Sequence, residues 1–223
     1  MSGPASMTGN ALRIGVDLGG TKTEVVALDD RGVEHYRLRR PTPRGDYAGT
    51  VALVTGLVRE AEREAGAAAS VGVGTPGSVV PETGRMQNCN STWLNGRPLP
   101  ADLARSLDRP VAIANDADCF ALSEAVDGAG AGAGTVFGAI LGTGVGGGVV
   151  VEGRLLRGAN GIAGEWGHLP LPALDRAVPA PLRERAQRMP PRHCWCGRRN
   201  CIETWLSGPG LAATRAEFAG GDA

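Results

Sequence analysis

The stretch RIGVDLGGTK occupies residues 13–22 and decides the fold. Its apolar run ends at Leu18 and predicts a buried strand, and the glycines Gly19 and Gly20 predict a tight turn. Residues 24–28 (EVVAL) are apolar after Glu24 and predict the returning strand of a hairpin. A turn of glycines exposes bare backbone N–H groups that can form an anion-binding nest. The stretch therefore predicts a hairpin whose tip can hold a phosphate, with a plain tight turn as the simpler alternative.

A second segment is built in the same way. Residues 135–141 predict a strand, residues 142–147 (GTGVGG) predict a turn, and residues 148–151 predict the returning strand. Two hairpins of one kind, one in each half of the chain, suggest two related lobes around a cleft. Two facing nests can hold a polyphosphate.

Strands and helices alternate between these hairpins. Strands are predicted at residues 33–39, 70–74 and 111–114, helices at residues 46–66, 101–107 and 117–126, and an asparagine-rich loop at residues 88–96. Asp46 is placed to cap the first helix and Gly66 to end it. The pattern predicts an α/β fold for the 223-residue chain.

The composition is that of an ordinary globular protein, with 42% hydrophobic and 21% charged residues and a formal net charge of zero. A neutral balance does not indicate a nucleic-acid or membrane partner. Residues 1–12 lack an apolar signal core and are expected to be a disordered extension, and no apolar run could cross a bilayer. We therefore expect a cytoplasmic protein.

Three of the five cysteines, Cys194, Cys196 and Cys201, fall within eight residues, and His168 precedes them in a glycine-bracketed turn. Cysteine and histidine are ligands of tetrahedral zinc, and in the cytoplasm clustered cysteines indicate metal rather than disulfides, which are the alternative. The spacing is not that of a zinc finger. His193 is a rival ligand.

The remaining parts of this region are expected to be structural. Cys89 and Cys119 are not expected to bind metal, and Cys119, on an apolar helix, is expected in the core. Residues 170–191 contain six prolines and predict a long surface loop.

Five motifs in this order resemble the ROK family of sugar kinases and sugar-sensing repressors, and the likeness runs from residue 13 to about residue 211. They are Asp17-Leu18-Gly19-Gly20-Thr21-Lys22, Gly74-Thr75-Pro76-Gly77, Asn115-Asp116-Ala117, Gly142-Thr143-Gly144, and the element from Glu165 through His168 and the cysteines to Glu203. The resemblance implies an actin-like ATPase (ribonuclease H-like) fold. Its lobes would be residues 13–115 and residues 116–223, the second carrying a zinc-binding loop.

The loop at residues 90–96 most resembles ROK fructokinases (mannofructokinases). The resemblance therefore implies an enzyme that uses ATP and Mg²⁺ to phosphorylate the 6-hydroxyl of D-fructose, or of mannose. The residues it places around ATP are Gly15, Val16, Asp17, Leu18, Gly19, Gly20, Thr21, Lys22, Gly142, Thr143, Gly144, Val145, Gly146, Gly147, Gly148 and Val149. Asp17 would hold Mg²⁺ through water or else cap the turn, and Lys22 would contact phosphate or be an ordinary solvated lysine.

Asp116 is the predicted catalytic base, which would accept the proton of the attacking sugar hydroxyl. A helix N-cap is its alternative role, and Asp118 stands where the family usually has asparagine. The residues implied in sugar binding are Asn90, Asn115, Asp116, Glu165, His168 and Glu203. Glu165 could instead be a surface residue, Glu203 a helix-start residue, and Asn90 and Asn95 turn formers.

The resemblance implies a structural zinc bound by His168, Cys194, Cys196 and Cys201. One ring nitrogen of His168 would bind the metal and the other would face the sugar. Since Glu165 and Glu203 flank these ligands in the sequence, the metal would hold both carboxylates in place.

The chain stops at Ala223, whereas family members continue through a further part of the second lobe. We therefore expect an incomplete second lobe, weak ATP binding and low stability. Glucokinase, N-acetylhexosamine kinase and an inactive sugar-binding remnant are alternatives, and a repressor is disfavoured because only twelve residues precede Arg13. Members of the family often form homodimers.

Overall fold

The computed structural model describes residues 12–171 and 179–219, which form two compact units divided between Asp116 and Ala117. The predicted extension at residues 1–12 lies outside the described part of the chain, apart from Leu12. No helix in these two ranges combines the length and the apolar character needed to cross a membrane.

The first unit is a five-stranded sheet with helices. Its elements are β1 (Arg13–Leu18), β2 (Lys22–Leu28), β3 (Glu34–Pro41), α1 (Tyr47–Ala65), β4 (Ser70–Thr75), β5 (Ser78–Val79), β6 (Met86–Gln87), η1 (Thr92–Leu94), α2 (Leu99–Leu107) and β7 (Val111–Asn115). The strand order is β3-β2-β1-β4-β7, in which the first three strands are antiparallel and β4 and β7 run parallel to β1. The strands β5 and β6 form a separate two-stranded ribbon.

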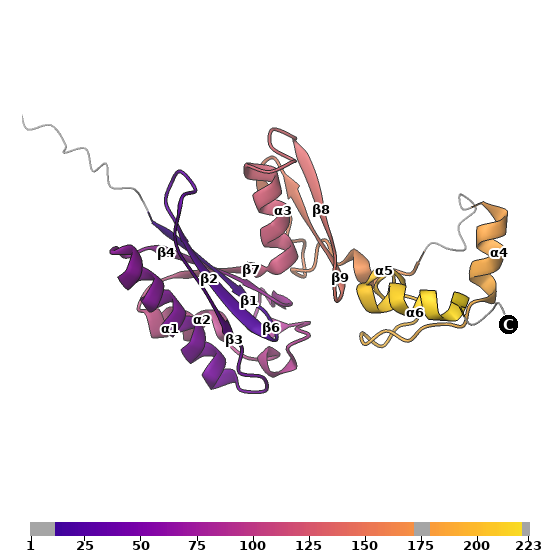
Figure 1. Cartoon of the computed structure of the whole chain (residues 1–223), viewed down its shortest axis with the longest axis horizontal. Coiled ribbons are helices and arrows are strands. Elements are labelled where there is room, and N and C mark those ends of the chain that lie inside the picture. The colour runs from indigo at the N-terminus through magenta and orange to yellow at the C-terminus, as the bar shows by residue number, and fades with distance from the viewer. Residues whose placement is uncertain (1–11, 172–178, 220–223) are drawn as a thin grey trace, which may run out of the picture. The chain divides into compact units, whose positions relative to one another are not determined.

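The helix α1 has the boundaries that the sequence predicts. The Asp46 carboxylate accepts a hydrogen bond from the Gly49 N–H at 2.9 Å, and Gly66 ends the helix at φ 74°, a left-handed conformation that glycine adopts without strain. Val54 and Val58 on its apolar stripe are fully buried. The helices α1 and α2 lie on the same face of the sheet (Figure 1) and pack with it into one core within residues 12–107.

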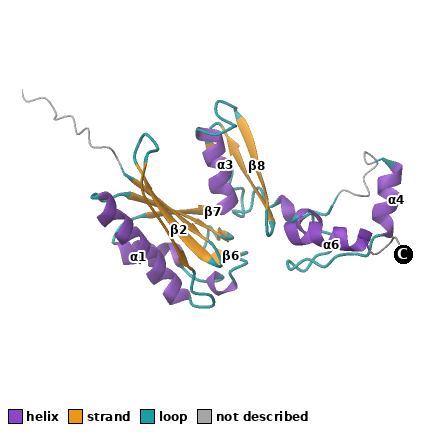
Figure 2. Cartoon of the chain, viewed as in Figure 1, coloured by secondary structure: helices purple, strands orange, loops and turns teal. Residues whose placement is uncertain are grey.

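The second unit is smaller. Its elements are α3 (Asp116–Val126, whose first residue belongs to the first unit), β8 (Thr135–Leu141), β9 (Val145–Val151), β10 (Arg154–Leu155), η2 (Trp166–His168), α4 (Ala180–Arg188), α5 (Glu203–Leu206) and α6 (Gly208–Ala219). The antiparallel sheet has the order β10-β9-β8 (Figure 2). The helix α3 packs against it so closely that a Cβ at Gly138 or Gly148 would lie 2.8 or 2.7 Å from the Ala121 Cβ.

The second hairpin turn is shorter than predicted. The strand β9 already begins at Val145, and Leu141 pairs with Val145, so the turn holds only residues 142–144. The glycines that follow lie in the strand because neighbours approach it closely: a Cβ at Gly147 would lie 2.9 Å from the Trp166 ring.

Two further predictions are wrong. The stretch predicted as a surface loop, residues 170–191, contains the helix α4; Pro181 is compatible with it because first-turn N–H groups need no helical acceptor. Residues 172–178 of that stretch lie outside the described residues. Cys119, predicted in the core, is exposed, because the packed positions of α3 are Ala117 and Ala121.

Candidate active site and metal centre

The turn between β1 and β2 is closed by hydrogen bonds and has no room for side chains at its glycines. The Gly19 N–H donates to the Lys22 carbonyl (3.0 Å), and the Thr42 hydroxyl donates to the Gly19 carbonyl (2.8 Å). A Cβ at Gly19 would lie 2.7 Å from the Lys22 oxygen, and one at Gly20 would lie 2.8 Å from Ser91 Oγ. The backbone is bare here, as close approach by phosphate oxygens requires.

Asp17 precedes this turn and pairs across the hairpin with Glu24. Loss of surrounding water, and then the negative charge of Glu24, raise the pKa of Asp17 above its ordinary value, against the opposing effects of Arg39 and Lys22. Glu24 is itself ion-paired with Arg37 and Arg39. An exposed carboxylate that lies opposite a second carboxylate in the hairpin fits the predicted role of holding hydrated Mg²⁺.

Three parallel strands end at one edge of this sheet. Asp17 on β1 is in register with Gly74 on β4, which is in register with Ala114 on β7. Neighbouring strands lie about 4.8 Å apart, so roughly 10 Å separates the backbones at Asp17 and Ala114. Asn115 and the exposed Asp116 follow directly. The predicted magnesium residue and the predicted base thus share one edge of the sheet.

Asn115 is held at this edge by its carboxamide, which donates to the Gly77 carbonyl at 3.0 Å. Gly77 has φ +73°, and a Cβ there would lie 2.2 Å from the Gln87 carbonyl oxygen. Only glycine fits this close approach of Gly77 to Gln87 of β6. Gly77, in the loop after β4, therefore connects Asn115 at the end of β7 with the ribbon β5–β6.

The asparagine-rich loop that follows β6 is held mainly by its own side chains. The Asn95 carboxamide accepts from the Cys89 N–H (2.9 Å) and donates to the Cys89 carbonyl (3.1 Å). The Trp93 indole N–H donates to the Thr50 hydroxyl of α1 at 3.1 Å. Asn90 is exposed at the surface of this loop. Asn95 therefore determines the shape of the loop, while Asn90 is accessible to a ligand.

In the second unit, the turn between β8 and β9 is fixed from several sides. The Gly142 N–H donates to the Gly144 carbonyl (2.9 Å), and the Gly208 N–H at the start of α6 donates to the Gly142 carbonyl (2.8 Å). Glu203 Oε2 accepts from the Val145 N–H at 3.0 Å. A Cβ at Gly144 would lie 2.7 Å from the same oxygen. The tip is a compact, bare-backbone turn like the one in the first unit.

The other residues that the resemblance places around ATP differ in accessibility. Val16, Leu18 and Val145 are at most 4% exposed, so only their backbone could meet a nucleotide, and the Val145 N–H already donates to Glu203. Thr143 and Lys22 are exposed.

The short helix η2 carries the predicted sugar residue Glu165 at its start and packs against β9. The Trp166 indole N–H donates to the Gly146 carbonyl at 2.7 Å. A Cβ at Gly167 would lie 2.0 Å from the Val145 carbonyl oxygen, so glycine is required there. Glu165 is half-buried at this junction.

The four predicted metal ligands converge. One ligand atom from each of His168, Cys194, Cys196 and Cys201 lies within 4.8 Å of the others. The Cys196 and Cys201 Sγ atoms are 3.7 Å apart, and Cys194 Sγ lies 3.5 Å from His168 Nδ1. A tetrahedron with Zn–S of about 2.3 Å and Zn–N of about 2.0 Å has edges of about 3.8 and 3.5 Å, so these residues fit zinc.

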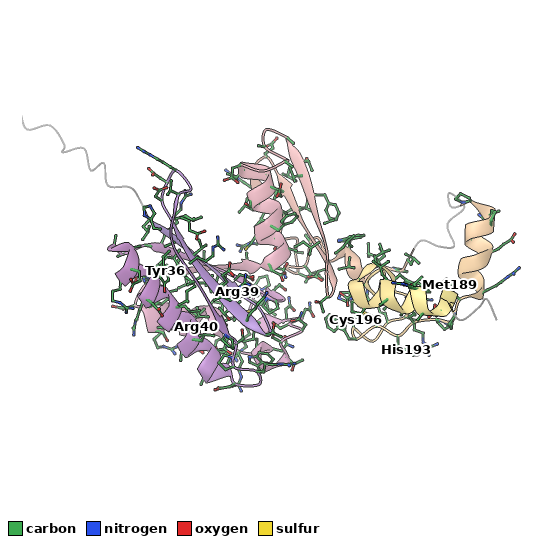
Figure 3. All side chains as sticks on the ribbon, viewed as in Figure 1. Tyr36, Arg39, Arg40, Met189, His193 and Cys196 are labelled. Carbon is green, nitrogen blue, oxygen red and sulfur yellow. The ribbon has the colours of Figure 1, made fainter. Side chains whose placement is uncertain are left out.

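The rival ligand His193 is not among these four residues. It forms an antiparallel bridge with Arg199 and is exposed; Figure 3 labels it together with the ligand residue Cys196. Since Nδ1 of His168 faces the thiols, its Nε2 is the nitrogen left for a sugar.

The thiols of the cluster differ in how readily they lose a proton. Burial opposes ionisation of Cys196, but the Arg198 N–H and hydrogen bonds with Cys194 and Cys201 outweigh it and lower the pKa of Cys196. Burial, followed by the hydrogen bonds with Cys196 and Cys194, raises the pKa of Cys201 to about 12. Thiols this close need a cation between them to ionise together.

Trp195 is a residue that the sequence predictions missed. It stands between two ligand cysteines, and its ring meets His168 edge-on at 4.9 Å. Its indole N–H donates to Glu203 Oε1 at 2.5 Å, although the side chain is 60% exposed. Its position between Cys194 and Cys196 is the feature of the sequence from which a role near the metal ligands could have been predicted.

The predicted site residues fall into two sets. The first unit contains Asp17, the first glycine turn, Asn90, Asn115 and Asp116; the second contains the other glycine turn, Glu165, His168, Glu203 and the cysteines. In the first set, Asp17 and Asp116 lie at the ends of strands in register; in the second, Glu203 contacts the glycine turn and the four metal-ligand residues converge. That the two sets face one cleft stays a prediction.

Comparison with known proteins identifies the family. The model of the ROK family matches residues 13–219. The N-acetyl-D-glucosamine kinase of Pectobacterium atrosepticum is 43% identical over 88% of this chain, and that of Yersinia pestis is 44% identical over 92%. The chain covers 63% and 77% of these two proteins, so it spans less than two thirds of the length of the first.

Solved structures show the same fold. The ROK hexokinase of Thermus thermophilus matches with a TM-score of 0.73 and 31% identity, over 95% of this chain and 70% of that one. The ROK glucokinase of Streptomyces griseus, solved with glucose and AMPPNP, matches with a TM-score of 0.72 and 29% identity, over 95% and 62%. The predicted actin-like ATPase fold is thereby confirmed, and the chain belongs to the ROK family.

Proposed function

We propose that this protein is an ATP-dependent hexose kinase that phosphorylates the 6-hydroxyl of an N-acetylhexosamine, with N-acetylglucosamine as its substrate. The observation that carries the proposal is the placement of Asp116. It follows β7 at the sheet edge that also presents Asp17 and the glycine turn after β1. A base and a magnesium-binding carboxylate at one edge are what phosphoryl transfer to a hydroxyl requires.

The protein's contribution to this reaction is positioning and charge. Asp116 accepts the proton of the sugar hydroxyl, and Asn115, held by Gly77, orients the sugar beside it. The two bare turns would bind phosphate oxygens through backbone N–H groups. Magnesium-bound ATP supplies the phosphoryl group, and Asp17 would hold the magnesium through water.

Relatives favour the N-acetylhexosamine alternative over the fructose that the loop at residues 90–96 suggested. Two N-acetyl-D-glucosamine kinases are 43% and 44% identical to this chain. In the loop itself, the oxygen and the nitrogen of the Asn95 carboxamide both form hydrogen bonds with the Cys89 backbone. This structural role accounts for an asparagine at position 95 without any contact to a sugar. Fructose is the second candidate.

Zinc at the four-ligand cluster would supply a rigid anchor for the loop that carries it. His168 would bind through Nδ1 and present Nε2 toward the sugar, and Glu203 would remain beside Trp195. With all four positions occupied by protein ligands, such a site is structural.

A sugar panel tests the substrate. ADP formation is measured with N-acetylglucosamine, N-acetylmannosamine, glucose, mannose and fructose at equal concentration, with a sugar-free reaction as the control for ATP hydrolysis. We expect kcat/KM for N-acetylglucosamine to exceed that for fructose at least about tenfold, since a sugar without the acetamido group leaves the polar groups that would bind it unpaired. A preference for fructose would replace the proposal with the second candidate, and no sugar-dependent turnover would favour an inactive remnant.

Asp116→Asn tests the base. We expect kcat to fall by about 10²- to 10⁴-fold, because the amide cannot accept the proton, while sugar binding by calorimetry is retained. Asp127→Asn, at an exposed position just past α3, is the matched control and should keep full turnover. Full turnover of Asp116→Asn would show that another group removes the proton.

A further inference from the structure

The Glu203 carboxylate joins two parts of the second unit. Its Oε2 accepts from the Val145 N–H at the start of β9. Its Oε1 accepts from the indole N–H of Trp195, which lies in the segment of residues 194–201 that we call the cysteine-rich loop. Val145 and Glu203 are 58 residues apart in the sequence. One carboxylate therefore bridges the glycine turn of residues 142–144 and the metal-ligand cluster.

Trp195 is in turn oriented by the cluster. Its backbone lies between the ligands Cys194 and Cys196, and its ring contacts the ligand His168 edge-on with the planes at 85°. An indole that is 60% exposed has little packing to hold it. The contact with His168 and the hydrogen bond to Glu203 are what define its place, so its orientation depends on the arrangement of the ligands.

The glycine turn depends on Glu203 because glycine has wide conformational freedom. The carboxylate binds the first N–H after the turn and occupies the space where a side chain at Gly144 would be, 2.7 Å from its Oε2. It also takes the Val145 N–H away from any phosphate, and the Gly142 N–H is taken by Gly144. Glu203 is therefore the one side chain, beside the backbone bonds of Gly142, that holds this turn among the described residues, and it removes the Val145 N–H from the donors that the turn can offer.

We propose that Glu203 and Trp195 are positioning residues that transmit the metal-bound conformation of the cysteine-rich loop to the turn at residues 142–144. Loading the four-ligand cluster orders Trp195, Trp195 orients the Glu203 carboxylate, and Glu203 fixes the turn. The inference rests on the proposed function in one respect, namely that the turn at residues 142–144 binds the phosphates of ATP. The chain of contacts can be tested without catalysis.

The test measures the rate of amide hydrogen exchange at Val145. NMR monitors this exchange in the full chain with one equivalent of Zn²⁺ added. Trp195→Phe retains an aromatic side chain beside His168, removes the indole donor and makes the ring smaller. We expect Val145 to exchange at least about threefold faster in this variant, because a carboxylate released on one side holds its other hydrogen bond less firmly. Trp93→Phe is the matched control, since it also removes an indole N–H, here one that donates to the Thr50 hydroxyl within the first unit. It should leave Val145 unchanged.

Two comparisons decide the outcome. Val150, buried in the same strand, is the internal reference and should keep its protection in Trp195→Phe. Equal loss of protection at Val145 and Val150 would mean that Trp195 is a general stabiliser, and an unchanged rate at Val145 would break the chain of contacts; either result overturns the proposal.

Enzyme kinetics then separate this inference from the proposed function. Trp195→Phe should raise KM for ATP about threefold or more and leave kcat within about twofold. Normal KM for ATP together with faster exchange at Val145 would show that the turn does not bind ATP, which overturns its assigned use. Lack of activity in the unmodified chain counts against the proposed kinase alone, because the exchange measurement does not require turnover.

Discussion

Single residues in this protein show how one side chain serves the fold, the site or both. Asn95 binds both the N–H and the carbonyl of Cys89 and is therefore a structural residue of its loop. Asn115 donates to Gly77 and at the same time stands beside the predicted base. Glu203, predicted to bind sugar, has one protein donor on each oxygen. A carboxylate can accept further hydrogen bonds, so these contacts leave its sugar role as a prediction.

Glu62 and Arg109 form the best-defined ion pair of the first unit. Their side chains make two parallel hydrogen bonds of 2.6 and 2.8 Å, and Glu62 also accepts from the Ala69 N–H. Both groups are less than a third exposed. We predict that Glu62→Gln lowers the free energy of unfolding at pH 7 by about 1–2 kcal/mol in urea unfolding, because Arg109 loses its charged partner. Glu64→Gln, at an exposed neighbouring position, should change it by less than about 0.5 kcal/mol.

The same pair gives stability a dependence on pH. The hydrogen bonds from Arg109 hold the pKa of Glu62 below its ordinary value of 4.5. The ionised form is therefore favoured by folding, and the stabilisation is complete above that value and is lost as the pH falls through the folded-state pKa. The difference between wild type and Glu62→Gln should accordingly shrink on acidification. A difference that stays constant down to pH 3 would contradict this assignment.

At the level of elements, α1 illustrates control by its ends. Asp46→Ala removes the acceptor for the Gly49 N–H, and we predict a loss of about 0.5–2 kcal/mol in the free energy of unfolding. Asp46→Asn should restore most of that loss, since asparagine caps helices as well as aspartate does. Equal destabilisation by both substitutions would indicate that the charge, rather than the cap, matters.

The cysteine-rich loop is the element that we expect to depend on metal, because the four candidate ligands meet there. We predict that Cys201→Ser lowers zinc affinity at least about tenfold in a competition titration, because a thiolate ligand is lost from the cluster. Cys119→Ser is the control, since this thiol is exposed and outside the cluster. Similar zinc affinity in both variants would show that the four side chains do not bind the ion together.

On the scale of the whole molecule, the two units differ in what stabilises them. The first has a continuous core within residues 12–107 that contains no predicted metal ligand. In the second, Phe137 and Leu141 on β8 are 52% and 58% exposed, and the metal cluster joins distant segments. Small domains with limited cores commonly depend on such a metal.

We therefore predict that a zinc chelator lowers the melting temperature of the second unit and leaves that of the first within about 2 °C. Hydrogen exchange with mass spectrometry during a temperature ramp can follow peptides of both units separately. The Cys201→Ser variant should reproduce the effect without chelator. A single transition in which both units shift equally would contradict independent stabilisation.

Much of the architecture can be predicted from the sequence because its determinants are local. The alternation of apolar residues in β1, and Asp46 and Gly66 at the ends of α1, act within a few residues of chain. The metal ligands could be proposed because histidine and clustered cysteines have few other uses in this pattern. Local reasoning failed where packing decides: the glycines of β9 looked like a turn but are a strand that Ala121 and Trp166 approach closely.

From the sequence alone follow the strand hairpins, the capped helix and the likeness to the ROK family, and it supplies the residues that we propose to act on a sugar. Only the tertiary structure decided which side chains meet: Glu203 with Val145 and Trp195, Asn95 with Cys89, and four ligands with matched separations. The physical reason is range. Periodicity and capping act between near neighbours in the chain, whereas a contact across 58 residues exists only after the intervening segments have packed.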